Sequence, residues 1–250
     1  MLSKALKLAI RNPRSFIQRM QTVPKGVLRR TILPMRADYR RRFKMSLYQW
    51  LLYHQQGVVF EKCTWMGARA LKNPLDAWIY QEIIYEVKPD VIVEIGSAYG
   101  GSALFLANML DLLGIGLVVS VDITRELFNV KHDRIVLVTG DSSSAEVVAQ
   151  VADLCRDKKV LVIHDGSHVE EDVLKDLRHY SKFVNVGSYI IVEDGIVDLF
   201  SPRTALGRMY NGPLLATEQF LKEQPNFEVD SQRERYILTY NPKGFLKRVH

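Results

Sequence analysis

Residues 91–101 read VIVEIGSAYGG, and this stretch decides the fold of the chain. Val91–Ile95 has the apolar composition of a buried strand, and it runs through a glycine turn into a helix-like segment over residues 102–113. Glycines let the backbone turn tightly and approach a ligand, and the first turn of a helix offers unpaired N–H groups. The acid Glu94 favours a ligand with a positive charge or hydroxyls, and S-adenosylmethionine has both. A dinucleotide would favour the spacing G-x-G-x-x-G, whereas this turn reads E-x-G-x-x-x-G.

The rest of the chain alternates strand-like and helix-like segments. Strands are expected over 90–95, 117–123, 134–139, 159–164 and 188–193, with late strands 226–230 and 235–240 that could pair as a hairpin. Helices are expected over 38–56, 73–87, 101–113, 144–157, 169–182 and 213–224, and residues 57–72 are expected to be irregular or short strand. This alternation predicts an α/β fold with a mostly parallel sheet and helices on both faces.

Five successive strands end in acids: Glu94, Asp122, Asp141, Asp165, and the pair Glu193 and Asp194. Ligands of such sheets lie beyond the carboxyl ends of the strands. Asp122 is placed to accept ribose hydroxyls, and Asp141 with Ser142 is placed to bind adenine, although Asp141 could instead be a helix N-cap. The residues expected to contact the cofactor are Glu94, Gly96, Ser97, Tyr99, Gly100, Ser102, Asp122, Asp141 and Ser142.

The last acids form a second group. Asp165, Glu193 and Asp194 would repel one another unless a cation binds or a proton is shared, and oxygen ligands suit Mg²⁺, Ca²⁺ or Mn²⁺. A metal there would orient a substrate hydroxyl and lower its pKa. His168 lies three residues after Asp165 and is a candidate general base; the alternative is a histidine with no catalytic role. His164 is expected to be structural.

The basic residues are concentrated at the N-terminus. Residues 1–44 hold thirteen Lys and Arg against one acid, Asp38, so this arm carries +12 and the remainder −6 of the net +6. This asymmetry argues against a nucleic-acid groove across the domain. No apolar run approaches the roughly 20 residues that span a bilayer. The arm could be a cationic helix at a membrane surface, a tail, a packed helix or a mitochondrial presequence. The expected domains are thus a basic arm, 1–44, and a catalytic domain, 45–250.

Two distant cysteines, Cys63 and Cys155, form no disulfide framework, which favours a reducing compartment. We therefore expect a cytoplasmic protein, with the inner face of the membrane as a further location. The oligomeric state stays open, and a homo-oligomer is one alternative.

Blocks of residues from Trp65 to Arg248 resemble the cephalosporin hydroxylase-like family, which includes rhamnosyl O-methyltransferases. The blocks are Trp65-Met66-Gly67 with Lys72, Gln81-Glu82-Ile83, Glu94 to Ser102, Gly140-Asp141-Ser142, Asp165 to His168, Glu193-Asp194, Gly212-Pro213 and Asn241 to Phe245. The resemblance implies a class I S-adenosylmethionine-dependent methyltransferase with a seven-stranded sheet, one strand of which is antiparallel.

The resemblance also implies Mg²⁺ at Asp165, Glu193 and Asp194, as in catechol-type O-methyltransferases. Those enzymes place a lysine base three residues after the first metal ligand, whereas His168 stands there in this chain. The implied acceptor is a sugar hydroxyl on a glycolipid, a polysaccharide precursor or a glycosylated natural product. Trp65, Met66, Lys72 and Tyr99 are candidates for walls or a lid, with ordinary packing as the alternative.

Three other functions are weighed against methyl transfer to a hydroxyl. The glycine spacing argues against a nicotinamide-dependent (NAD) dehydrogenase. Asp165-Gly-Ser-His168 does not match the Asn/Asp-Pro-Pro-aromatic motif of nucleobase N-methyltransferases. A non-catalytic scaffold with a methyltransferase fold is the remaining alternative, and three costly carboxylates kept together argue against it.

Overall fold

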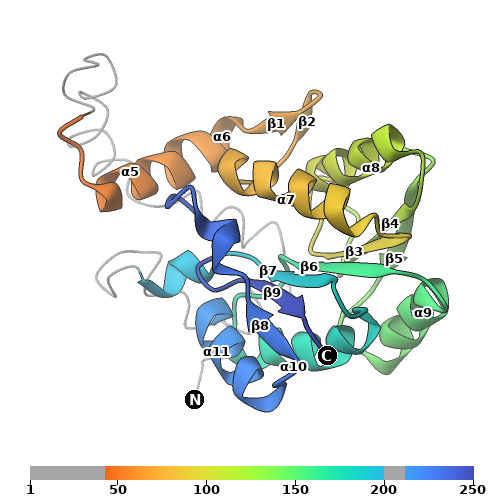
Figure 1. The fold of residues 1–250 in the computed structure, drawn as a ribbon. Coiled ribbons are helices and arrows are strands. Elements are labelled where there is room, and N and C mark those ends of the chain that lie inside the picture. The colour runs from red at the N-terminus through yellow and green to blue at the C-terminus, as the bar shows by residue number, and fades with distance from the viewer. Residues whose placement is uncertain (1–42, 200–211) are drawn as a thin grey trace, which may run out of the picture.

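The computed structural model describes residues 43–199 and 212–250. A seven-stranded sheet lies between two layers of helices (Figure 1). The strands are β3 (Val91–Ile95), β4 (Leu117–Asp122), β5 (Ile135–Thr139), β6 (Val160–His164), β7 (Tyr189–Val192), β8 (Phe227–Val229) and β9 (Phe245–Arg248). Their spatial order is β5-β4-β3-β6-β7-β9-β8; β3 to β7 run parallel, and β9 pairs antiparallel with both neighbours. The predicted fold class is confirmed.

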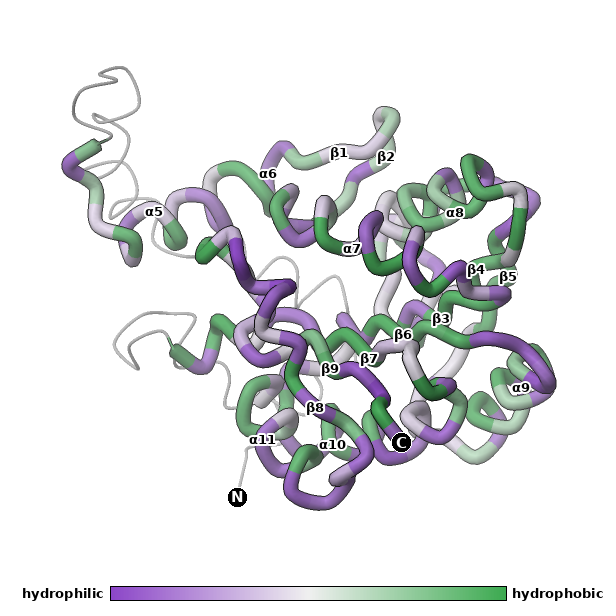
Figure 2. The backbone as a smooth tube through the Cα atoms, in the orientation of Figure 1, coloured by the Kyte–Doolittle hydropathy of each residue, from purple (hydrophilic) through white to green (hydrophobic). Residues whose placement is uncertain are grey.

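Helices cover both faces because the central strands are apolar on both sides. One face packs on α7 (Pro74–Val87) and α8 (Gly101–Leu113). The other packs on α9 (Ala145–Cys155), α10 (Glu170–Tyr180) and α11 (Pro213–Glu223). Figure 2 shows the hydrophobic colour along β6 and β7 between these layers. Glu94 lies two residues after Ile92 on β3 and therefore faces the α7–α8 layer as Ile92 does, whereas Val93 faces the other layer.

Local signals set the helix ends where predicted. Asn73 caps α7, with its side chain accepting from Leu75 N, and Pro74 follows in the first turn. The bounds of α8 match the prediction, and the other central elements differ from it by one or two residues at one or both ends. Cys155 is a buried free thiol, and Cys63 is also free.

The segment before α7 is more helical than expected. The part of the predicted helix 38–56 up to residue 42 lies outside the described residues, as does most of the basic arm. The described part begins at α5 (Leu47–His54), which Ser46 caps, and continues through a π-helix (Gln55–Val59) and α6 (Phe60–Lys62). Val59 and Phe60 continue the helix past residue 56 because they pack against Ile196 and Val197. A hairpin of β1 (Thr64–Trp65) and β2 (Ala68–Arg69) follows.

The predicted strand 235–240 is wrong. Residues 231–234 form a 3-10 helix, and the strand that pairs with β8 is β9. Tyr240 is buried not in the sheet but beside His54, whose Nδ1 lies 2.7 Å from the Tyr240 hydroxyl. Phe245 and Leu246 are wholly buried and take the place in the sheet. Two further 3-10 turns, Ser181–Phe183 and Gly195–Leu199, complete the described elements.

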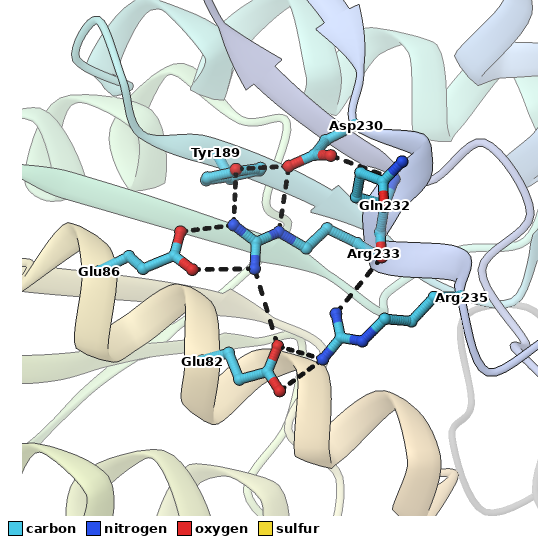
Figure 3. Close-up of polar contacts among 7 residues, drawn as sticks. All are labelled: Glu82, Glu86, Tyr189, Asp230, Gln232, Arg233 and Arg235. Carbon is cyan, nitrogen blue, oxygen red and sulfur yellow. Dashed lines mark hydrogen bonds and ion pairs between the residues drawn. The ribbon is translucent and has the colours of Figure 1, made fainter.

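An ion-pair cluster joins α7 to the C-terminal part of the sheet (Figure 3). Arg233 donates to Glu86 on α7, to Asp230 after β8 and to the Tyr189 hydroxyl on β7. Arg235 pairs with Glu82 one turn earlier on α7. The cluster thus ties α7 to β7 and to the segment that follows β8.

Candidate active site

The glycine turn after β3 packs against Asp165 and is hydrogen-bonded to Asp122 at the end of β4. Gly96 has φ +87°, and a Cβ there would lie 2.0 Å from the carbonyl oxygen of Asp165, so only glycine fits. Asp122 Oδ2 accepts hydrogen bonds from Ser97 N (3.0 Å) and Ala98 N (2.8 Å). Asp122 therefore shapes the loop itself, which the sequence did not indicate.

Glu94 supplies a wholly buried carboxylate beneath this loop. Burial raises its pKa to about 7, opposed by Lys72 and Ser102. Within residues 43–199 and 212–250, neither of its oxygens has a hydrogen-bond partner of good geometry. A buried acceptor of this kind fits a ligand that brings its own donors, such as the amino group or the ribose hydroxyls of S-adenosylmethionine.

The other predicted cofactor residues are spread around the same edge of the sheet. Gly100 caps α8 with φ +86°. The Tyr99 hydroxyl accepts from Arg69 (2.9 Å), whose guanidinium stacks 4.4 Å from the Tyr99 ring centroid, so Tyr99 faces the β1–β2 hairpin. Trp65 packs edge-to-face on Phe105, whereas Met66 is exposed.

Asp141 and Ser142 follow β5. Asp141 accepts from the backbone N–H and the hydroxyl of Ser143, and Ser144 is the N-cap of α9, so the N-cap alternative for Asp141 is wrong. Ser142 donates to Asp176 Oδ2 (2.8 Å), the same oxygen that lies 3.1 Å from His164 Nε2. His164 is buried in this network, consistent with a structural role.

Asp165, His168 and Asp194 form the metal-type corner of the site. Each offers one ligand atom, and these atoms all lie within 4.8 Å of one another. His168 Nε2 lies 3.0 Å from Asp194 Oδ2. Burial alone would lower the pKa of His168, but Asp194 and Asp165 outweigh it, and the pKa lies above the ordinary value. Two carboxylates and an imidazole are a donor set that suits a divalent cation.

Glu193 turns away from this corner toward Lys72. The Lys72 ammonium lies 2.6 Å from Glu193 Oε1 and 2.6 Å from Asp165 Oδ2. Burial raises the pKa of both carboxyls, and Lys72 opposes the shift. Burial alone would lower the pKa of Lys72, but the nearby carboxylates have the larger effect and raise this pKa above its ordinary value. The side chain therefore stays protonated and is unsuited to act as a base. The sequence placed Lys72 only among possible walls; its position in a family block was the one available signal.

Asn241 and Gly212, from two of the family blocks late in the sequence, contact the backbone of corner residues. Asp194 has the left-handed φ of +59°, and its N–H donates to Asn241 Oδ1 (3.1 Å). Asn241 in turn donates to the Tyr80 hydroxyl (2.8 Å). A Cβ on Gly212 would lie 1.9 Å from the His168 carbonyl oxygen, so this glycine permits the close approach of the α11 start. Asn241 is a functional candidate that the sequence marked only as the start of a family block.

The strand order, the glycine turn after β3 and the acids at the carboxyl ends of the strands define a class I methyltransferase. Residues 57–249 match the family model described as Rhamnosyl O-methyltransferase/CmcI, and the chain belongs to this family. It is therefore an S-adenosylmethionine-dependent O-methyltransferase, and the predicted family and enzyme class are confirmed. The dehydrogenase alternative is set aside by the same finding.

Two relatives show how far the similarity extends. The rhamnosyl O-methyltransferase of Mycobacterium leprae (strain TN) is 32% identical over 203 residues, which cover 78% of this chain and 87% of that protein. The rhamnosyl O-methyltransferase of Mycobacterium tuberculosis (strain ATCC 25618 / H37Rv) is 29% identical and covers 78% and 82%.

Solved structures of CmcI share the fold. One, described as a complex with Mg and SAM, matches with a TM-score of 0.60 and 21% identity over 76% of this chain and 78% of that chain. A second, described as an apo structure, matches with a TM-score of 0.58, 22% identity and the same coverage.

Proposed function

We propose that this enzyme transfers the methyl group of S-adenosylmethionine to a sugar hydroxyl in a Mg²⁺-dependent reaction. One observation carries the proposal: Gly96 of the cofactor loop packs against the backbone of Asp165, so the loop and the metal-type corner form one site. The names of the curated relatives support a rhamnosyl acceptor.

Asp165 and Asp194, with Glu193 beside them, are the residues that would hold Mg²⁺. When bound, the metal supplies charge that lowers the pKa of the acceptor hydroxyl. Glu94 and the loop Gly96–Gly100 bind and orient the cofactor, so that positioning supplies much of the rate. His168, whose ring faces the acids of the corner, is the residue that takes the hydroxyl proton.

The test combines binding with turnover. Calorimetry should show that the wild-type chain binds both S-adenosylmethionine and Mg²⁺, and that Asp165→Asn loses Mg²⁺ while it retains the cofactor. Transfer of a labelled methyl group to a rhamnosyl glycoside should stop with EDTA. Glu218→Gln, at an exposed acid paired with Lys243, is the control and should change neither. Turnover that EDTA leaves unchanged would contradict the metal requirement.

We also propose that the basic arm, 1–44, attaches the enzyme to the anionic inner face of a membrane, where a glycolipid acceptor would lie. Its charge of +12 supports this. Among the described residues, no helix has the length and hydropathy to cross a bilayer. The full chain should sediment with vesicles that contain phosphatidylglycerol and be released by 0.5 M salt, and substitution of Arg40, Arg41 and Arg42 by Gln should weaken binding. Equal binding to neutral phosphatidylcholine vesicles would contradict the proposal.

A further inference from the structure

Lys72 reaches the centre of the site from a segment that is fixed at both ends. It lies between β2 and α7. On one side Ala70 N donates to Cys63 O (3.1 Å). On the other, Asn73 caps α7 and donates to Leu238 O (2.9 Å). With its backbone held there, the Lys72 side chain has 9% of its surface exposed, and its ammonium lies between two strand ends.

The two contacts of the ammonium are to carboxylates from neighbouring parallel strands. Asp165 follows β6 and Glu193 follows β7, and each offers one oxygen at 2.6 Å. These buried carboxylates would repel each other if both were charged and unpaired, so a cation between them stabilises the arrangement. Asp165 is shared, because its carboxylate also belongs to the corner with His168 and Asp194.

We infer that Lys72 is a resident cation of the metal site: its ammonium holds Asp165 and Glu193 in place before the metal arrives, and its charge weakens Mg²⁺ binding. This inference rests on the proposed Mg²⁺ site. Two cations that share one carboxylate at a few ångströms repel each other even at the effective dielectric of a protein site. Lys72 is thus a positioning residue, and the metal meets ligands that are already ordered.

The experiment measures metal binding and melting, without turnover. Lys72→Met removes the charge and keeps much of the apolar stem. Lys72→Gln also removes the charge but keeps a hydrogen-bond donor, and it serves as the second variant if Lys72→Met folds poorly. Lys72→Arg keeps the charge. Lys243→Met is the matched control, because Lys243 is an exposed lysine that pairs with Glu218 away from the site.

We expect the two uncharged variants to bind Mg²⁺ about tenfold or more tightly than the wild type by calorimetry, since a repelling charge is gone. In EDTA they should melt at a lower temperature than the wild type, and Mg²⁺ should restore much of the loss. Lys72→Arg and Lys243→Met should bind Mg²⁺ as the wild type does.

Two results would overturn the inference, and they differ. If the wild type binds Mg²⁺ and the uncharged variants bind it equally or more weakly, Lys72 is not a competing cation, while the proposed function stands. If the wild type binds no Mg²⁺, the proposed metal site and this inference both fall.

Discussion

At the scale of single residues, His168 has a position that fits two roles. Its Nε2 lies 3.0 Å from Asp194 and within reach of the same corner as Asp165, so it could remove a proton or bind the metal itself. The two roles differ in what a substitution changes. A base acts only on turnover, whereas a ligand also holds the ion.

For His168→Gln we expect methyl transfer to fall by about 10²-fold or more, the usual contribution of a general base. The Kd for Mg²⁺ should stay within about twofold of the wild-type value. Single-turnover rates and calorimetry on the same preparation separate the two. A parallel tenfold loss of Mg²⁺ affinity would instead make His168 a metal ligand.

Asp76 gives a pH dependence of stability although it is not one of the corner acids, and the charge of Asp194 contributes to it. It is buried at the start of α7 and accepts from Asn73 Nδ2 (2.9 Å) and Tyr240 N (2.8 Å). Burial raises its pKa to about 6, against an ordinary value of 3.8, although its hydrogen bonds oppose the shift. Between these values the folded protein retains a proton that the unfolded chain has lost, so this carboxyl costs stability as pH rises through the window.

Asp76→Asn removes that titration and keeps an acceptor oxygen. We expect the variant to gain stability relative to the wild type between pH 4 and pH 6, by about 1–3 kcal/mol, with no further change above pH 7. Urea unfolding at pH 4.5, 6 and 7.5 measures the difference. A difference that stays constant across these values would show that Asp76 has the same pKa in both states.

At the scale of elements, the β3–α8 turn links the predicted cofactor residues to Asp165 of the metal-type corner. Among the glycines of this βα unit that have positive φ, Gly96 and Gly114 have contrasting surroundings. Gly96 has φ +87° and no room for a Cβ, whereas Gly114, at the end of α8, has φ +70° and open space around it. A substitution at Gly114 therefore tests backbone strain alone, whereas one at Gly96 adds steric overlap.

Gly114→Ala should cost about 1 kcal/mol, the strain of a non-glycine residue in the left-handed region. Gly96→Ala should cost more and should weaken S-adenosylmethionine and Mg²⁺ together, because the loop must move away from Asp165. Melting curves and calorimetry on both variants provide the comparison. Equal effects of the two substitutions would mean that the loop moves freely relative to Asp165.

At the scale of the whole molecule, the cluster in Figure 3 connects α7 with β7 and the β8–β9 hairpin. Arg233 is buried and contacts groups from all three parts, while Arg235 is more exposed and pairs with Glu82. Removal of a buried charge leaves its partners without compensation, whereas an exposed pair contributes little.

Arg233→Met should therefore lower the free energy of unfolding by about 2–4 kcal/mol. Arg235→Met, its neighbour in the same cluster, should lower it by less than about 1 kcal/mol. Chemical denaturation of both variants measures the two values. Similar losses would show that burial does not determine how much these ion pairs contribute to the free energy of unfolding.

The sequence alone determined the alternation of strands and helices, the glycine turn at Gly96 and the row of acids at the strand ends. These features are local: apolar periodicity, capping by Asn73 and turn chemistry act over a few residues, so they can be read in order along the chain. The resemblance to the family rested on the same short blocks.

Only the tertiary structure decided which distant side chains meet. Lys72 reaches Asp165 and Glu193 across 93 and 121 residues of sequence. Tyr240 leaves the sheet because Asp76 binds its backbone N–H, and β9 pairs instead. Contacts of this kind depend on the packing of whole layers, and no local pattern encodes them.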